Sequence, residues 1–335
     1  MDRARDLPDW PLSTASRFVR HRPHDWHIQE TGTGDTILLL HGAGASTHSW
    51  QALIPPLSTQ FHVIALDLPG QGFSRAGTKR RLGLTGMTED IAALCASQGW
   101  RPRAIIGHSA GAAIALNLAR TLRHKDGGPP DIVGINAALD RFEGVAGWLF
   151  PVLAKVLALN PLTAAAFTMG RGHADRARRL IQSTGSTLDA KGLRLYARLI
   201  ADRNHVDATL QMMAQWDIDA LLHHLPDIEA RCLWLTGARD TAVSPRVSER
   251  AAQKLARAET LHLDDLGHLA HEEDPETVLH HFHEGEFAHV VRAAELCFDD
   301  FVPVIGGHHS QHAVFPYAGI VYEHFQAFVF FIKIS

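Results

Sequence analysis

The sequence predicts an α/β fold in which a mostly parallel central sheet is covered by helices on both faces and carries an inserted helical cap. Short apolar runs alternate with helical stretches, as is typical of a sheet buried on both faces. This alternation stops after Asn136 and resumes near Arg231, and the interval carries only helical patterns. We therefore expect a core from residues 1–136 and 225–283, a cap from 137–224, and a C-terminal extension, 284–335, of uncertain structure.

The strands are predicted in order from their apolar runs. The first two, Ser16–Val19 and Trp26–Gln29, are expected to form an antiparallel hairpin because a short polar loop joins them. The later runs are expected to be parallel and joined by right-handed helical crossovers. These strands are 36–40, 61–66, 104–106, 132–136, 232–236 and 260–263, and the helices include 85–97, 110–122 and 244–256.

The cap is predicted to contain helices at 145–159, 174–183, 189–201 and 206–216. Ligands of open α/β sheets bind beyond the carboxyl ends of the strands, so an insertion at this place should shape the pocket. Val145–Met169 is almost uncharged, but Lys155, Pro151 and Pro161 favour two short amphipathic helices over a membrane span. A lid over the pocket is expected, and shallow contact of the cap with a bilayer remains open.

Composition narrows the class of protein further. The 335 residues carry a net charge of −4, which gives no electrostatic footprint for nucleic acid. Three cysteines lie far apart in sequence, as fits a reducing cytoplasm. The N-terminus leads into Pro8 and Trp10 without an apolar core segment, which argues against a secretory signal. We expect a cytoplasmic protein, with peripheral membrane contact as the alternative.

The most informative motif is Gly107-His108-Ser109-Ala110-Gly111. It stands between a predicted strand and a strong helix former, the setting that a G-x-S-x-G nucleophile elbow requires. Glycines on both sides suit a strained turn that exposes the serine hydroxyl. An ordinary turn of small residues is the alternative.

A serine hydroxyl needs a base, and usually a carboxylate that orients the base. Asp240 follows the strand 232–236 and His268 follows the next strand, so the order is Ser, Asp, His. We expect Ser109 as nucleophile, His268 as base and Asp240 as orienting acid. Asp264 and Asp265 are rival acids, and His271 is expected to be solvated or structural.

The segment His41-Gly42-Ala43-Gly44 follows the strand 36–40, and its small residues would let the backbone approach a substrate. The backbone N–H groups of Ala43 and Ala110 are the expected oxyanion hole, with a glycine-rich turn that binds no ligand as the alternative. Candidate pocket residues are His41, Gly42, His108, Trp148, Phe150, Met213 and Trp216. No cofactor is expected, and despite 23 histidines we expect no metal site, because none of the paired histidines belongs to a recognised ligand set.

The chain resembles the α/β-hydrolase superfamily over about Phe18 to Val278. The matching segments are 41–44, 67–74 (Asp-Leu-Pro-Gly-Gln-Gly-Phe-Ser), 107–111, 237–240 and 267–268. More narrowly, it is similar to the magnesium chelatase accessory proteins of bacteriochlorophyll biosynthesis, through segments that include 9–11, 15–19, 26–29, 48–50, 160–161, 185–189, 196–199, 212–217 and 267–273. That resemblance implies a role in photosynthetic pigment synthesis, assistance to magnesium insertion into protoporphyrin IX, and chelatase subunits as partners. The tail beyond about His280 carries no mark of the family.

These observations favour a serine hydrolase that acts on an ester-like bond in a small apolar substrate. The alternative is a non-hydrolytic accessory protein that binds a tetrapyrrole. Side chains available to stack on a macrocycle are Trp148, Phe150, Phe167, Met169, Met212, Met213 and Trp216, although ordinary cap packing also explains them. Carbon–carbon bond hydrolysis and cofactor-free haloperoxidation use the same elbow and stay open. A dehalogenase or epoxide hydrolase is disfavoured, because those enzymes need an aspartate where Ser109 stands.

Overall fold

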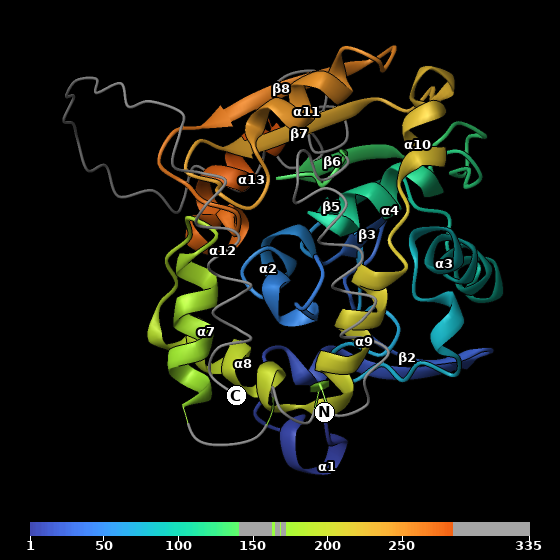
Figure 1. Cartoon of the computed structure of the whole chain (residues 1–335). Helices are drawn as coiled ribbons and strands as arrows, with labels where there is room; N and C mark the ends of the chain where they lie inside the picture. The colour runs from blue at the N-terminus through green and yellow to red at the C-terminus, as the bar shows by residue number, and fades with distance from the viewer. Residues whose placement is uncertain (141–162, 165–167, 169–171, 284–335) are drawn as a thin grey trace.

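The central sheet of the computed structural model confirms the predicted α/β architecture (Figure 1). The structure describes residues 1–140, 163–164, 168 and 172–283. Within these residues the sheet has eight strands in the order β1-β2-β4-β3-β5-β6-β7-β8. Strands β1 and β2 are antiparallel to each other, β2 is antiparallel to β4, and every other neighbouring pair is parallel. The strands are β1 Ser16–His21, β2 His24–Thr31, β3 Thr36–Leu40, β4 His62–Leu66, β5 Ala104–His108, β6 Asp131–Ile135, β7 Cys232–Gly237 and β8 Ala258–Leu263.

The middle strands are continuously apolar because both of their faces are covered. All five residues of β3 are buried, and the four apolar ones alternate between two separate hydrophobic clusters. Leu38 and Leu40 belong to the cluster that includes α3 (Leu84–Gln98), α4 (Ala110–Leu118) and α11 (Pro245–Ala252). Ile37 and Leu39 belong to the cluster on the opposite face, which includes η2 (Thr47–Trp50), α2 (Ile54–Leu57) and α13 (Pro275–His283). The sheet is therefore the middle layer of three.

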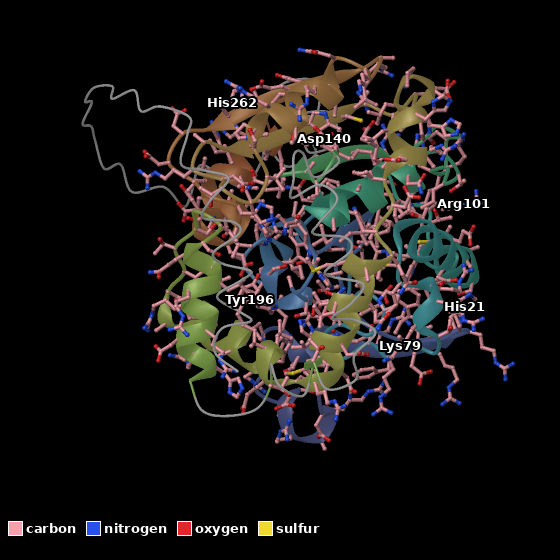
Figure 2. The ribbon with its side chains drawn as sticks, in the orientation of Figure 1. His21, Lys79, Arg101, Asp140, Tyr196 and His262 are labelled. Atoms are coloured by element: carbon pink, nitrogen blue, oxygen red, sulfur yellow. The ribbon has the colours of Figure 1, made fainter. Side chains whose placement is uncertain are left out.

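The described part of the insertion is helical, as the sequence predicts. Its helices are α7 His173–Gln182, α8 Ala190–Ala201, α9 Arg203–Ala214 and α10 Asp219–His223. Figure 1 shows α7 directly below α12 (Ala270–Glu273), the short helix that follows β8. A hydrogen bond of 2.6 Å joins this layer to the core, from the Tyr196 hydroxyl of α8 to Glu272 of α12 (Tyr196 is labelled in Figure 2). The helix predicted at 145–159 and the extension 284–335 lie outside the described residues.

Candidate active site

Ser109 lies at a sharp turn between β5 and α4, as the elbow motif predicts. Its backbone has a φ of 51° and a ψ of −115°, a region that residues other than glycine rarely occupy. The flanking glycines are required sterically. A Cβ on Gly107 would lie 2.5 Å from the Ala112 backbone, and one on Gly111 would lie 2.0 Å from the Leu40 carbonyl oxygen. The helix can cross the strands this closely only because Gly107 and Gly111 have no Cβ.

The side chains of Asp240 and His268 are hydrogen-bonded to each other. Asp240 Oδ2 lies 2.7 Å from His268 Nδ1, and both residues are buried. The other carboxylate oxygen, Oδ1, accepts two hydrogen bonds of 2.8 Å from the N–H groups of Ala242 and Val243. An Asp240 carboxylate held in this way accepts a hydrogen bond from the Nδ1–H of His268. The proton of the neutral ring therefore stays on Nδ1, and Nε2 is left unprotonated, as a general base requires.

The segment that joins α7 to α8 packs against the loops that carry Asp240 and His268. The carbonyl of Thr184 accepts from the N–H groups of Thr241 and His268, both at 3.3 Å. Ser186 Oγ accepts from the Leu269 N–H at 2.8 Å. A Cβ on Gly185 would lie 1.8 Å from the Arg239 carbonyl oxygen, so only glycine permits this approach. The cap thus contacts the backbone on either side of the acid–base pair.

The loop after β3 is held directly beside Ser109. A Cβ on Gly42 would lie 2.7 Å from His108 Nδ1 and 3.1 Å from Ser109 Cβ. His41 Nε2 accepts from the Leu68 N–H at 2.9 Å, so its Nδ1 carries the proton and donates to the Gly42 carbonyl at 2.7 Å. In a trans peptide the N–H of Ala43 then points away from His41. This orientation is compatible with the expected oxyanion-hole role of Ala43, which stays a prediction.

The expected pocket residues have different surroundings. His41 and His108 are buried, and each is hydrogen-bonded to a backbone carbonyl. His41 donates to the Gly42 carbonyl at 2.7 Å, and His108 donates to the His268 carbonyl at 2.9 Å. Met213 is half-buried on α9, and the half-buried Trp216 packs against the cluster of α3 and α4. Trp148 and Phe150 lie outside the described residues.

The rivals to the predicted acid and base are placed differently from Asp240 and His268. Asp264 and Asp265 are exposed, and Asp265 pairs with Arg239 at 2.5 Å. His271 is fully buried, so of the two roles expected for it the solvated one does not apply. Its ring packs against those of Trp50 and His108, each with centroids 4.6 Å apart.

A group of buried imidazoles surrounds this part of the site. Burial lowers the pKa of His48 and of His271 to about 3 and that of His205 to about 4. Burial, together with the neighbouring His271 and His268, also holds the pKa of His108 well below its usual value. Conversely, burial raises the pKa of the Glu272 carboxyl to about 7. The four histidines are therefore uncharged at neutral pH, whereas Glu272 is about half ionised there.

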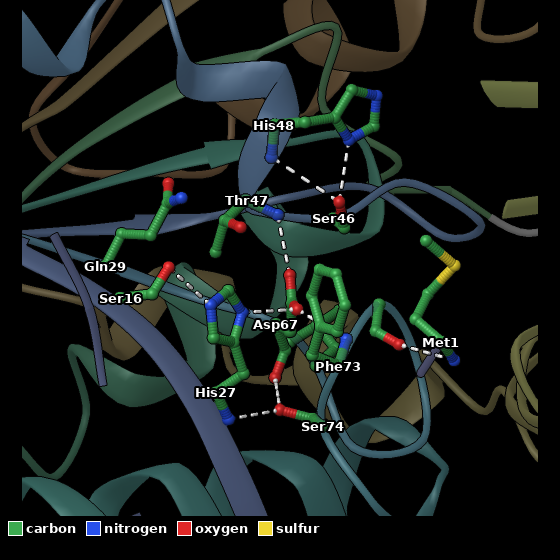
Figure 3. Close-up of polar contacts among 12 residues, drawn as sticks. Met1, Ser16, His27, Gln29, Ser46, Thr47, His48, Asp67, Phe73 and Ser74 are labelled. Atoms are coloured by element: carbon green, nitrogen blue, oxygen red, sulfur yellow. Dashed lines mark hydrogen bonds and ion pairs between the residues drawn. The ribbon is translucent and has the colours of Figure 1, made fainter. Parts of the chain in front are cut away.

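A second Ser–His–Asp chain, which the sequence analysis did not anticipate, lies between β1, β2 and the loop after β4 (Figure 3). Ser16 Oγ is 2.9 Å from His27 Nε2, and His27 Nδ1 is 2.6 Å from Asp67 Oδ2. Burial alone would raise the pKa of Asp67, but the charge and hydrogen bond of His27 lower it to about 2. Asp67 also accepts from the N–H groups of Thr47 and Phe73, both at 2.7 Å. This chain ties the first hairpin to the core.

In residues 1–140 and 172–283 and the three described positions between them, no group of three or more His, Cys, Asp or Glu side chains is arranged to hold a metal ion. No helix in the same ranges is both long and apolar enough to cross a bilayer.

The sequence and structure were compared with known proteins. Residues 35–275 match the family model of the alpha/beta hydrolase fold. The chain is 46% identical over 271 residues to the magnesium-chelatase 30 kDa subunit of Rhodobacter capsulatus, an alignment that covers 80% of this chain and 93% of that protein. It is 28% identical over 266 residues to a pimeloyl-[acyl-carrier protein] methyl ester esterase of Stenotrophomonas maltophilia, an alignment that covers 76% of this chain and 95% of that protein. The structure of the epoxide hydrolase CorEH superposes with a TM-score of 0.68 at 20% identity, covering 83% of this chain and 99% of that one, a likeness of fold alone.

The chain belongs to the α/β-hydrolase fold family, and within it to the group that contains the magnesium-chelatase 30 kDa subunit. The resemblance inferred from the sequence motifs is thereby confirmed.

Proposed function

We propose that this protein is a serine hydrolase that cleaves an ester-like bond in an apolar substrate. The observation that carries the proposal is the 2.7 Å hydrogen bond between His268 and Asp240, on loops that follow strands of the same parallel sheet as the Ser109 elbow. Parallel strands end at the same edge of the sheet, which supports the placement of Ser109 near this pair. The similarity to an enzyme named as a methyl ester esterase supports the same class of reaction.

The reaction takes place in two halves. His268 Nε2 accepts the Ser109 hydroxyl proton as Ser109 Oγ attacks the ester carbonyl, and Asp240 keeps the imidazole oriented and stabilises its charge. The backbone N–H groups of Ala43 and Ala110 donate to the oxyanion. Ala110 is the first residue of α4, where an N–H has no partner within its own helix. The alcohol leaves with the proton from His268, and the acid remains bound to Ser109 as an ester. A water molecule then attacks this ester while His268 takes its proton, and the acid is released when His268 returns that proton to Ser109 Oγ.

Labelling with a fluorophosphonate probe tests the nucleophile, and turnover of short p-nitrophenyl esters tests the reaction. We expect wild-type protein to be labelled and Ser109→Ala to remain unlabelled and inactive. Ser16→Ala is the matched control, because Ser16 also contacts a His–Asp pair, and it should be labelled like wild type. Folded wild-type protein that is not labelled, or is labelled at a residue other than Ser109, contradicts the proposal.

A second candidate function is a non-hydrolytic accessory role in which the pocket binds a tetrapyrrole and the protein contacts chelatase subunits. Its support is the 46% identity to a protein named as a magnesium-chelatase subunit. A porphyrin titration, followed by the Soret band and tryptophan quenching, measures binding. Complementation of a deletion strain separates the two functions. If Ser109→Ala restores pigment synthesis and still binds porphyrin, the accessory role stands and hydrolysis is not required.

A further inference from the structure

Asn136 lies beside the nucleophile although it is not part of the elbow. It directly follows β6, whose Ile135 pairs with His108 of β5, so Asn136 is the neighbour of Ser109 across the sheet. Its φ of 48° is left-handed, as is the φ of Ser109. Asparagine tolerates this conformation better than most residues, and strained residues persist where their surroundings over-determine them. Two adjacent strand ends of this sheet thus carry strained residues at the same edge.

The carboxamide of Asn136 joins the two loops that carry the acid and the base. Asn136 Nδ2 donates to the carbonyls of Gly267 and His268, both at 2.9 Å, and Oδ1 accepts from the Gly237 N–H at 2.7 Å. Gly237 ends β7, just before the loop of Asp240. An amide is suited to this position because it presents donors and an acceptor together. The side chain is only 2% exposed, so water does not readily replace these bonds.

The strand that carries the nucleophile contributes a second bond to the same carbonyl. His108 Nε2 donates to the His268 carbonyl at 2.9 Å, which assigns the proton of this neutral ring to Nε2. The His268 backbone is therefore tied to β5 through His108 and to β6 through Asn136. The loops themselves touch, because a Cβ on Gly237 would lie 2.5 Å from the Gly267 carbonyl oxygen.

We propose that Asn136 is a positioning residue that fixes the His268–Asp240 pair relative to Ser109. The inference rests on the proposed hydrolytic function. Asn136 acts through the backbone of the two loops, while Asp240 and His268 carry the proton chemistry. A misplacement of about 1 Å in such a site costs on the order of 10²-fold in rate, even when it arises away from the reacting atoms.

The test uses Asn136→Gly, which removes the carboxamide and keeps the positive φ accessible. We expect kcat for a p-nitrophenyl ester to fall by about 100-fold with KM within about threefold of wild type. Asn136→Asp keeps an acceptor for Gly237 but places a carboxylate oxygen against two carbonyls, so it should be no more active at neutral pH. Thr88→Val is the control, because it removes a buried hydroxyl that donates to the Leu84 carbonyl in α3 and accepts from Asn117 of α4, away from both loops. It should lower Tm without lowering kcat.

A readout independent of turnover separates failure of this inference from failure of the proposed function. The His268 Nδ1 proton, hydrogen-bonded to Asp240, should give a downfield proton NMR signal that is missing in His268→Gln. In Asn136→Gly this signal should shift upfield or exchange with water faster, whether or not Ser109 is a nucleophile. An unchanged signal, or a kcat within threefold of wild type, overturns the positioning role. A fall in kcat that is fully explained by a smaller fraction of folded protein also overturns the positioning role.

Discussion

The buried histidines should make the protein unusually sensitive to mild acid. His48, His108, His205 and His271 are at most 3% exposed, and burial lowers the pKa of each, to about 3 for His48 and His271 and about 4 for His205. In the unfolded chain these imidazoles regain a pKa of about 6.5. Below that pH the unfolded state binds more protons than the folded state, so the free energy of unfolding decreases as pH falls.

The magnitude follows from the number of protons. Each histidine that stays neutral when folded contributes about 1.4 kcal/mol per pH unit once the unfolded form is protonated. Glu272 acts in the opposite direction, because its folded pKa of about 7 lies above its unfolded value of 4.5. Its contribution to stability therefore grows as pH falls from about 7 to about 4.5 and is fully present below that pH. With one carboxyl offsetting one of these four histidines, the free energy of unfolding should fall by at least about 4 kcal/mol between pH 6 and pH 5, since burial also lowers the pKa of His24 and of His41. This is a large part of the stability of a typical domain.

Urea unfolding at a series of pH values, followed by the fluorescence of buried tryptophans such as Trp50 and Trp234, measures this slope. His271→Gln should reduce the slope by about 1.4 kcal/mol per pH unit, whatever it does to stability at pH 8. His223→Gln, at an exposed position of α10, is the matched control and should leave the slope unchanged. A free energy of unfolding that changes by less than about 1 kcal/mol between pH 6 and pH 5 would refute the reasoning, because the imidazoles would then be protonated in the folded protein.

Three further predictions concern the candidate active site. Asp240→Asn should lower kcat about 10³- to 10⁴-fold in an ester assay, because the amide favours the wrong His268 tautomer. The protein should stay folded by circular dichroism, and activity near wild type would exclude Asp240 as the orienting acid. Gly42→Ala would place a methyl group 2.7 Å from His108 Nδ1 and force the loop away from Ser109. The value of kcat should therefore fall about 10²-fold, and an unchanged kcat would argue against this loop as the oxyanion hole. Ser186→Ala removes the acceptor of the Leu269 N–H and should cost about 1–3 kcal/mol in urea unfolding; a loss below about 0.5 kcal/mol would show that Ser186 does not stabilise the base loop.

The sequence was a good guide wherever structure depends on local pattern. The apolar run 36–40 coincides with β3, because a strand buried on both faces has to be apolar throughout. Gly107 and Gly111 predicted the strained turn of Ser109, since the glycines that the turn requires sterically lie within two residues of Ser109 in the sequence. The pairing of Asp240 with His268 was also accessible, because both follow strands that end at one edge of the sheet.

Contacts between distant segments were decided only by the tertiary structure. Asn136 marked merely the end of a strand in the sequence, and its carboxamide reaches Gly237 and Gly267 only because β6 and β7 are neighbours in the sheet. His271 resembled many other histidines, and its burial against Trp50 depends on how α12 meets η2. The sequence by itself therefore determined where the strands lie along the chain and the candidate chemistry of Ser109. Which side chains position the catalytic groups was decided by the packing of loops more than a hundred residues apart. The periodicity of a sequence predicts a helix or strand but does not predict which other segments it contacts.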